Sequence, residues 1–227
     1  MPNRKKILIN MILDKSGSMS SIAAKTISGY NEYLETLIAD ADKDDKMEYL
    51  VSLTMFDDKV DIKYKYVDVH YAPKLTSLTY NPGGMTALCD ALCTTINDTV
   101  EQDLYKDVEK IITVIFTDGQ ENASSTYDTV EARKMVLEKK NDTKSNWTFV
   151  YFGCDQDAWA ESSRIGIGAG NTISYAKGAM NNVVGANAFA AISHSRSANL
   201  KSTSYSTLVD LDDDSKGPDQ GTSSPKQ

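Results

Sequence analysis

The chain has 227 residues, enough for one α/β domain of about 200 residues and a short further segment. Hydrophobic residues make up 41% of the sequence and charged residues 25%, a balance typical of a soluble domain with a sizeable core. The formal net charge of −8 argues against non-specific binding to nucleic acid or anionic membranes, because such binding needs clustered lysine and arginine. It leaves metal binding open, since hard cations prefer carboxylates.

The beginning of the chain does not have the pattern of a targeting signal. A short apolar run, Ile7–Leu13, follows basic residues, but it contains Asn10, ends at Asp14 and precedes no small-residue cleavage site. No stretch approaches the ~20 apolar residues of a membrane span. The three cysteines form an odd number without a disulfide pattern, which favours a reducing compartment. We therefore expect a cytoplasmic protein.

The first part of the chain predicts a strand, a helix and a hairpin. Ile7–Leu13 and Tyr49–Phe56 are continuous apolar runs, typical of central strands that are covered on both faces. Between them, apolar residues recur with the helical period over Ala23–Ile38. In Val60–Tyr66 apolar and charged residues alternate, which predicts a half-exposed strand. The turn Asp57-Asp58-Lys59 makes it the second arm of a hairpin, so we place it antiparallel at the sheet edge.

The later part of the chain alternates helical and strand patterns. Helical periods cover Leu88–Val100 and Val130–Lys140, and buried strands are predicted at Ile111–Phe116 and Trp147–Phe152. Weaker patterns predict a helix at Asp155–Ser163, a strand at Thr172–Tyr175 and a helix at Lys177–Asn199. This order indicates a doubly wound, mostly parallel six-stranded α/β sheet with one antiparallel edge strand and helices on both faces.

The C-terminal segment differs in composition from the rest. Residues 201–227 are rich in Ser, Thr and Asp and show no sustained apolar period. Such a composition cannot bury enough apolar area to offset the entropy lost on ordering. We therefore expect one folded domain over residues 1–200 and a disordered acidic tail over 201–227.

Polar side chains follow two predicted strands and precede one predicted helix. Ligands of open α/β sheets bind at the carboxyl ends of the strands, where these residues would meet. The candidate metal ligands are two carboxylates and three hydroxyls, Asp14, Ser16, Ser18, Thr86 and Asp118. An oxygen-only set suits magnesium, manganese or calcium and does not suit zinc or copper.

The same residues carry a family resemblance. Asp-x-Ser-x-Ser after the first strand, Gly-Gly-x-Thr before a helix and Thr-Asp-Gly after a later strand resemble the metal-ion-dependent adhesion site (MIDAS) of von Willebrand factor A (VWA) domains. All five positions match, and the order of elements is similar from about residue 5 to 200. The chain looks closest to short, single-domain intracellular members of bacteria and their phages.

This resemblance implies a Rossmann-like VWA fold and a role for each matching residue. Ser16, Ser18 and Thr86 would coordinate magnesium directly or nearly so, whereas Asp14 and Asp118 would often act through water. A carboxylate of the partner protein would complete the octahedron. Each residue taken singly also has a structural interpretation as a loop or helix-cap residue. All five in the right order, each at a strand end or helix start, favour the metal site.

Other signals favour structural roles. The glycines of 166–170 lack the spacing of a dinucleotide loop and predict a turn. Cys89 and Cys93, one helical turn apart, are expected to be small buried residues. Asp90 could support Thr86 from one turn further along the helix, although a solvated or capping role is favoured. Asp57-Asp58 is expected only to form the hairpin turn.

Three kinds of function fit this sequence. The favoured one is a non-enzymatic binding module, in which the metal captures an acidic group of a partner protein, with no nucleic-acid or membrane partner. The alternative is a magnesium-dependent phosphatase or phosphotransferase. Haloacid-dehalogenase-like phosphatases carry a second aspartate two residues after the first, where this chain has Ser16. A third possibility is a structural or assembly component of a larger complex.

Overall fold

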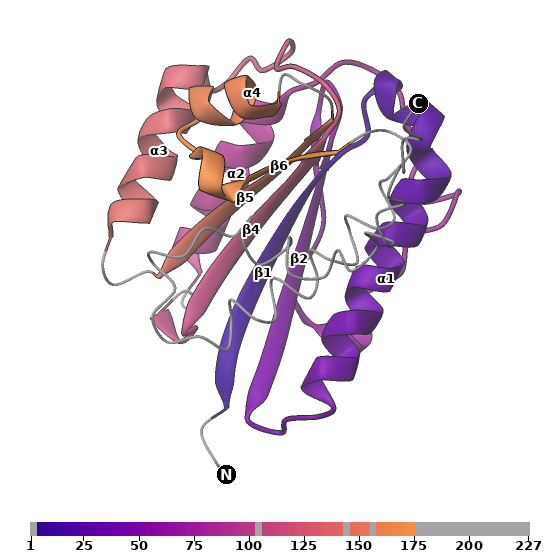
Figure 1. The fold of residues 1–227 in the computed structure, drawn as a ribbon, viewed down its shortest axis with the longest axis vertical. Helices are drawn as coiled ribbons and strands as arrows, with labels where there is room; N and C mark the ends of the chain where they lie inside the picture. The colour runs from indigo at the N-terminus through magenta and orange to yellow at the C-terminus, as the bar shows by residue number, and fades with distance from the viewer. Residues whose placement is uncertain (1–3, 103–105, 143–145, 155–157, 176–227) are drawn as a thin grey trace, which may run out of the picture.

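The fold is a single six-stranded sheet flanked by helices (Figure 1). The computed structural model describes residues 4–102, 106–142, 146–154 and 158–175. The strand order across the sheet is β3-β2-β1-β4-β5-β6. The strands are β1 (Lys5–Asp14), β2 (Met47–Phe56), β3 (Val60–Asp68), β4 (Lys110–Thr117), β5 (Trp147–Cys154) and β6 (Thr172–Tyr175).

The pairing of the strands confirms the expected topology. β1 pairs in parallel with both β2 and β4, and β5 continues the parallel sheet to β6. β3 is antiparallel to β2 and lies at the edge, as its alternating pattern predicts. The expected helix at 177–199 and the expected tail at 201–227 lie outside the described residues.

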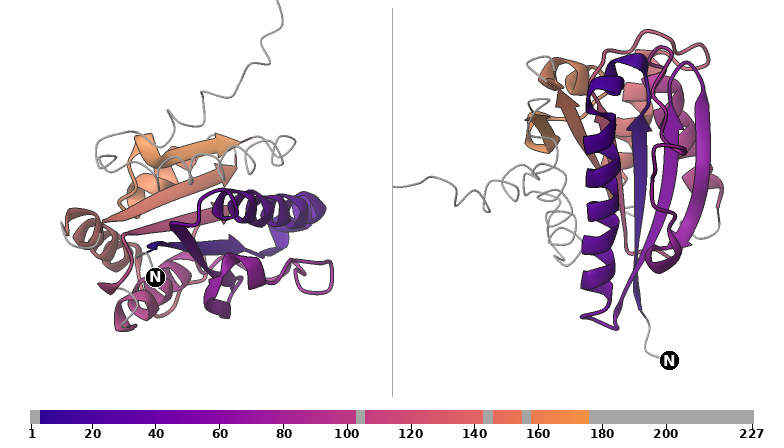
Figure 2. Two further views of the ribbon diagram at one scale, coloured as in Figure 1. Left: turned by 90° about the horizontal axis from the view of Figure 1, so that it is seen from below. Right: turned by 90° about the vertical axis from the view of Figure 1, so that its right-hand side faces the viewer.

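In the described ranges, four α-helices cover the two faces of the sheet. They are α1 (Ala23–Ala41), α2 (Leu88–Glu101), α3 (Thr129–Asn141) and α4 (Ala158–Arg164). Helix α1 lies on one side of the sheet, and α2 and α3 lie on the other (Figures 1 and 2). Short 3-10 helices precede α1 (η1, Gly17–Ile22), follow β3 (η2, Val69–Tyr71) and precede β6 (η4, Ala169–Asn171). The glycines of 166–170 lie in the turn between α4 and β6, as the sequence predicts.

Alternation along β1 divides the core into two layers. Ile7, Ile9, Met11 and Leu13 belong to the apolar cluster that includes α1 residues. Their neighbours Leu8 and Ile12 point to the opposite face and pack with α2 and α3 residues. Both faces of the central strands are thus covered, which explains why these strands are apolar without interruption. In the described part of the chain, no helix is long and apolar enough to cross a membrane.

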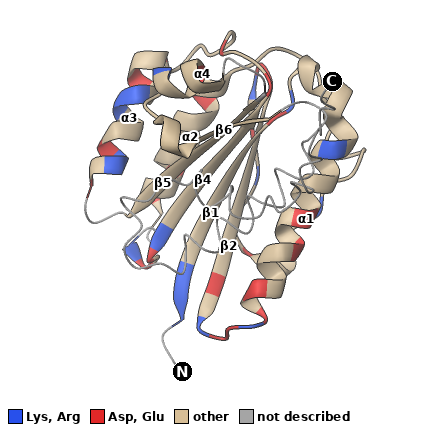
Figure 3. Ribbon diagram, in the orientation of Figure 1, with Lys and Arg blue, Asp and Glu red and all other residues tan. Residues whose placement is uncertain are grey.

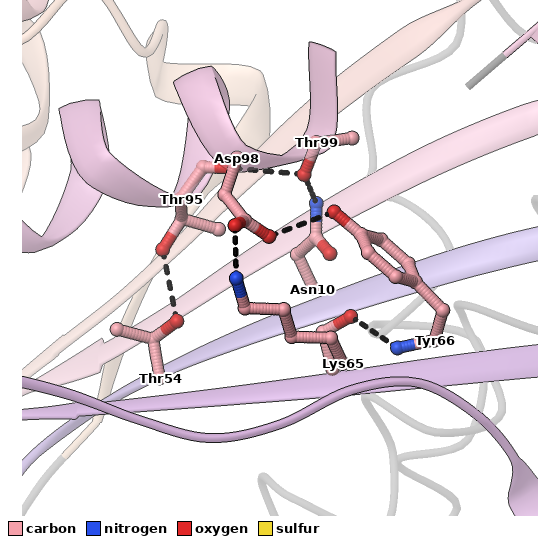
Figure 4. Close-up of polar contacts among 8 residues, drawn as sticks. Asn10, Thr54, Lys65, Tyr66, Thr95, Asp98 and Thr99 are labelled. Carbon is pink, nitrogen blue, oxygen red and sulfur yellow. Dashed lines mark hydrogen bonds and ion pairs between the residues drawn. The ribbon is translucent and has the colours of Figure 1, made fainter. Parts of the chain in front are cut away.

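Asn10 is the polar exception in β1 and joins the sheet to α2. Its side chain is fully buried on the α2 face, and its Nδ2 donates to Thr99 Oγ1 at 3.0 Å (Figure 4). One turn earlier in α2, Thr95 Oγ1 donates to Thr54 Oγ1 of β2, also at 3.0 Å. These two buried hydrogen bonds fix how α2 lies on the sheet, because an unmade buried hydrogen bond costs ~1–3 kcal/mol.

The edge strand β3 is also anchored to α2. Asp98 of α2 pairs with Lys65 and accepts a 2.9 Å hydrogen bond from the Tyr66 hydroxyl (Figure 4). The backbone of Tyr66 has φ = 53° where the β2–β3 register shifts, and its N–H donates to Ser52 Oγ at 3.0 Å. An irregular edge strand that turns its polar residues toward a helix is a poor template for pairing with other chains.

Candidate metal centre

Asp14 is the last residue of β1 and lies fully buried on the α2 face. Its Oδ1 accepts the Ser16 N–H at 2.6 Å, and its Oδ2 accepts the Thr117 hydroxyl, also at 2.6 Å. Burial raises the pKa of Asp14 to about 6, although the hydrogen bonds from Thr117 and Ser16 oppose this and the charge of Asp118 adds to it. The two hydrogen bonds therefore hold the carboxylate in one orientation, and its burial disfavours the ionised form.

The two serines and the second aspartate form a chain of contacts next to Asp14. The hydroxyls of Ser16 and Ser18 lie 3.1 Å apart, and Ser18 Oγ donates to Asp118 Oδ1 at 2.5 Å. Ser16 begins the turn into η1, and Asp118 follows the end of β4. The carboxyl ends of two neighbouring parallel strands thus place four of the five expected residues together.

Thr86 completes the group from a third segment. Its side chain is buried, and a Cβ added to Gly119 would lie 3.3 Å from Thr86 Oγ1 and 3.7 Å from Ser18 Oγ. The two hydroxyls therefore face the same small space beside Gly119. All five expected residues come together at the carboxyl ends of β1 and β4, as the sequence predicts.

The segment that carries Thr86 depends on a glycine. Gly84 has φ = +76°, and a Cβ there would collide with the Asp58 carboxylate. The same conformation allows two hydrogen bonds to the Asp14–Ser18 loop, from Gly17 N–H to Gly84 O at 3.1 Å and from Gly83 N–H to Lys15 O at 2.8 Å. Gly84 thus fits because a left-handed backbone and a close approach coincide there.

The hairpin turn between β2 and β3 supports the site as well. Asp57 accepts the Lys59 N–H at 2.9 Å, as expected for a turn, but it also forms a largely buried ion pair with Lys15. Burial would raise the pKa of Asp57, yet the hydrogen bonds from Lys15 and Lys59 lower it below its usual value. The carbonyl of Asp57 accepts the Ala87 N–H at 2.7 Å. The expectation that Asp57 only forms a turn was therefore incomplete.

Several supporting residues were not recognised from the sequence. Thr117 donates to Asp14, and its position as a hydroxyl residue at the end of an apolar strand could have indicated this. Tyr80 donates its hydroxyl to the Asp14 carbonyl at 2.6 Å, and no sequence pattern predicts that contact. The sequence favours a solvated or capping role for Asp90 over support of Thr86, whereas the structure buries Asp90 and its carboxylate accepts backbone N–H groups of the segment after Gly119.

The two cysteines of α2 behave as the sequence predicts. Cys89 and Cys93 are fully buried free thiols. Burial raises the pKa of each thiol to about 12, so neither is a ready thiolate nucleophile or metal ligand.

The donor set fits a hard divalent cation. It consists of two carboxylates and three hydroxyls, without nitrogen or sulfur. In the described ranges, no group of three or more His, Cys, Asp and Glu side chains could hold a metal. A cation at this place would therefore depend on the hydroxyls as much as on Asp14 and Asp118. It would also offset the negative charge of Asp118, which adds to the cost of ionising Asp14.

Comparison with known proteins supports the fold. No family model matches the sequence, and no curated protein matches it at a significant level. Among solved structures, a von Willebrand factor type A protein from Catenulispora acidiphila is similar, with 13% identity, a TM-score of 0.56, and coverage of 83% of this chain and 43% of that one. The pilus adhesin SpaC from Lactobacillus rhamnosus GG has 14% identity, a TM-score of 0.65, and coverage of 85% and 30%.

A third similar structure carries a metal in its description. Proximal thread matrix protein 1 from the mussel byssus, with a zinc-occupied MIDAS motif, has 15% identity, a TM-score of 0.50, and coverage of 82% and 46%. Zinc therefore occupies such a motif in that protein, although ligand type alone argues against zinc. This chain spans less than half of the length of each of the three. At this level of identity the comparisons define the fold: the chain has the fold of a VWA domain.

Proposed function

We propose that the chain is a metal-dependent protein-binding module. A divalent cation, magnesium by preference with manganese or calcium as substitutes, would be held by Asp14, Ser16, Ser18, Thr86 and Asp118. The cation would capture an acidic side chain of a partner protein. The convergence of these five oxygen-bearing side chains from three separate segments carries the proposal.

The composition of the site favours a carboxylate as the captured group. Hydroxyl ligands are neutral, so a cation held partly by them keeps more of its charge for a further ligand. This explains how a protein of net charge −8 could bind an acidic group, because the cation reverses the local sign. Lys and Arg residues are scattered over α3, the upper end of α1 and the beginnings of β1 and β4 (Figure 3).

The surroundings of Asp14 favour binding over phosphoryl transfer. The position two residues after Asp14, where a phosphatase of the compared type has its second aspartate, is the buried Ser16. The adjacent Lys15 is paired with Asp57. The named neighbours include a pilus adhesin and a thread matrix protein.

The free thiols Cys89 and Cys93 support a reducing, cytoplasmic location for this chain.

Affinity capture and magnesium titration test the proposal together. Partner capture is expected in millimolar magnesium, and it should fail in EDTA and in the Asp14→Ala and Thr86→Ala variants. Ser21→Ala is the matched control, since Ser21 carries an exposed hydroxyl close to Ser18 but outside the five residues. Magnesium should also raise the melting temperature, because a ligand at a hundredfold excess over its Kd stabilises the native state by about 2.7 kcal/mol.

A contrary result has a clear form. If the melting temperature does not change with magnesium across the millimolar range and partner capture persists in EDTA, the five residues are loop and cap residues. The proposed metal-dependent binding is then wrong.

A further inference from the structure

Helix α2 has no cap from its own local sequence. Its N-cap residue is Ala87, which has no side-chain hydrogen bond to offer. The first free amides of the helix are instead satisfied from the segment after β4. Cys89 N–H donates to Glu121 Oε2 at 2.7 Å, and Asp90 N–H donates to Ser124 Oγ at 3.0 Å. A carboxylate at this end of a helix also interacts favourably with the helix dipole.

A side chain of α2 also accepts hydrogen bonds from the backbone of the segment after β4. The buried carboxylate of Asp90 accepts three consecutive backbone N–H groups at 2.8–3.0 Å, those of Ser125, Thr126 and Tyr127. Glu121 Oε1 accepts the N–H groups of Ala123 and Ser124 at 3.0 and 2.8 Å. Residues 120–127 contain no helix or strand, so these two carboxylates replace the pairing that regular structure would supply.

The segment 120–127 also forms hydrogen bonds with both backbone groups of the candidate metal ligand Thr86, its N–H and its carbonyl. Thr86 N–H donates to Asn122 Oδ1 at 2.8 Å, and Thr86 O accepts the N–H groups of Asn122 and Ala123 at 3.0 and 3.2 Å. The segment begins directly after Asp118 and Gly119. Thr86 lies 32 positions from Asp118 in the sequence, but its hydrogen bonds tie it to the segment that directly follows Asp118 and Gly119.

We propose that Asp90 and Glu121 are positioning residues of the metal centre. Their role rests on the proposed function: they hold the segment 120–127 on the first turn of α2 and so set the placement of Thr86 relative to Asp118. Removal of a group that orients a metal ligand without touching the metal typically weakens metal binding by ~10–100-fold. Neither carboxylate is a metal ligand in this proposal, because their oxygens are occupied by backbone and hydroxyl donors.

Magnesium titration of the purified chain, by calorimetry with magnesium chloride as the only ligand, tests this role. Asp90→Asn and Glu121→Gln keep the shape of each side chain but place an amide NH2 against a backbone donor. Each is expected to raise the Kd for magnesium by ~10–100-fold with an unchanged far-UV circular dichroism spectrum. Amide exchange at 125–127 should become faster in Asp90→Asn, because the acceptor is weakened.

Asp128→Ala is the control for loss of stability alone, because alanine removes the side-chain cap. Asp128 caps α3, accepting the Glu131 N–H at 2.8 Å, and has no contact with Thr86 or Asp118 among the hydrogen bonds of the described residues. It should lower the melting temperature in EDTA and leave the magnesium Kd within about twofold of the unsubstituted chain.

The outcomes separate the two proposals. If the unsubstituted chain does not bind magnesium, the proposed function fails. If it binds magnesium and the Asp90→Asn and Glu121→Gln chains bind equally well, the metal-binding proposal stands and the positioning role is wrong. Should Asp90→Asn fail to fold, Glu121→Gln and Ser124→Ala decide the question by the same comparison, since Ser124 links Asp90 N–H to Glu121 Oε2.

Discussion

Asp14→Asn should stabilise the metal-free protein and abolish its response to magnesium. Burial raises the pKa of Asp14 from 3.8 to about 6. At 1.36 kcal/mol per pH unit, keeping this carboxyl ionised in the native state costs about 3 kcal/mol relative to the unfolded chain. The asparagine oxygen can still accept the Ser16 N–H. Thr117 can turn its proton to Gly119 O, 3.3 Å away, and accept from the new amide.

The expected gain in EDTA near neutral pH is therefore about 1–3 kcal/mol, because part of the 3 kcal/mol is lost to poorer hydrogen bonding. For a domain of this size that corresponds to an increase of ~2–12 °C in melting temperature. The native state binds the Asp14 proton more tightly than the unfolded chain does, so this charge lowers stability as the pH rises from about 4 to about 6. Below about pH 4 the two proteins should therefore melt alike.

Thermal unfolding followed by circular dichroism, with EDTA or with millimolar magnesium and at several pH values, measures these differences. In magnesium the order reverses, since only the unsubstituted protein gains the free energy of metal binding. Asp118→Ala should follow the same trend, neutral or stabilising in EDTA and unresponsive to magnesium. A variant Asp14→Asn that is less stable than the unsubstituted protein at every pH in EDTA would refute the reasoning, because the ionised carboxylate would then be stabilising.

Three further predictions follow from the packing and composition. Gly84→Ala should destabilise the fold by about 1–2 kcal/mol or more in chemical denaturation, because its backbone is left-handed and its Cβ has no room. Gly83→Ala, with nothing within 4 Å of the added Cβ, should stay within about 0.5 kcal/mol. Thr117→Val should cost about 1–3 kcal/mol by removing a buried donor from Asp14, whereas Thr117→Ser should recover most of it; equal losses in both would contradict the hydrogen-bond argument. Deletion of 205–227 should lower the melting temperature by less than ~4 °C, and a larger loss would mean that this segment packs on the domain.

The architecture could be predicted because each element carries its own local pattern. Buried strands are apolar without interruption, and the alternating charges of Val60–Asp68 mark an edge strand whichever residues pair with it. Two segments of the site could likewise be located, because parallel strands bring their carboxyl ends to one edge of the sheet, and the third could be located because Gly-Gly-x-Thr precedes a predicted helix. The alternation of β1 even decides the face on which Asp14 lies, opposite to that of Leu13.

The contacts that orient the site could not be predicted in the same way. The Thr117 hydroxyl donates to Asp14, 103 positions away in the sequence. The contact forms because Leu13 pairs with Phe116 in the parallel sheet, which makes the next residues, Asp14 and Thr117, neighbours. Asp90 and Glu121 join α2 to the segment after β4 by hydrogen bonds, although the sequence predicts only a solvated or capping role for Asp90 and singles out no role for Glu121.

By itself, the sequence determined which residue types stand at the strand ends and helix starts, because periodicity and turn chemistry act over a few neighbouring residues. Only the tertiary structure decided which donor meets which carboxylate oxygen. Hydrogen bonds require distances of about 3 Å and a defined direction. Small shifts in strand register or helix placement change every such pairing while leaving the local pattern of the sequence unaltered.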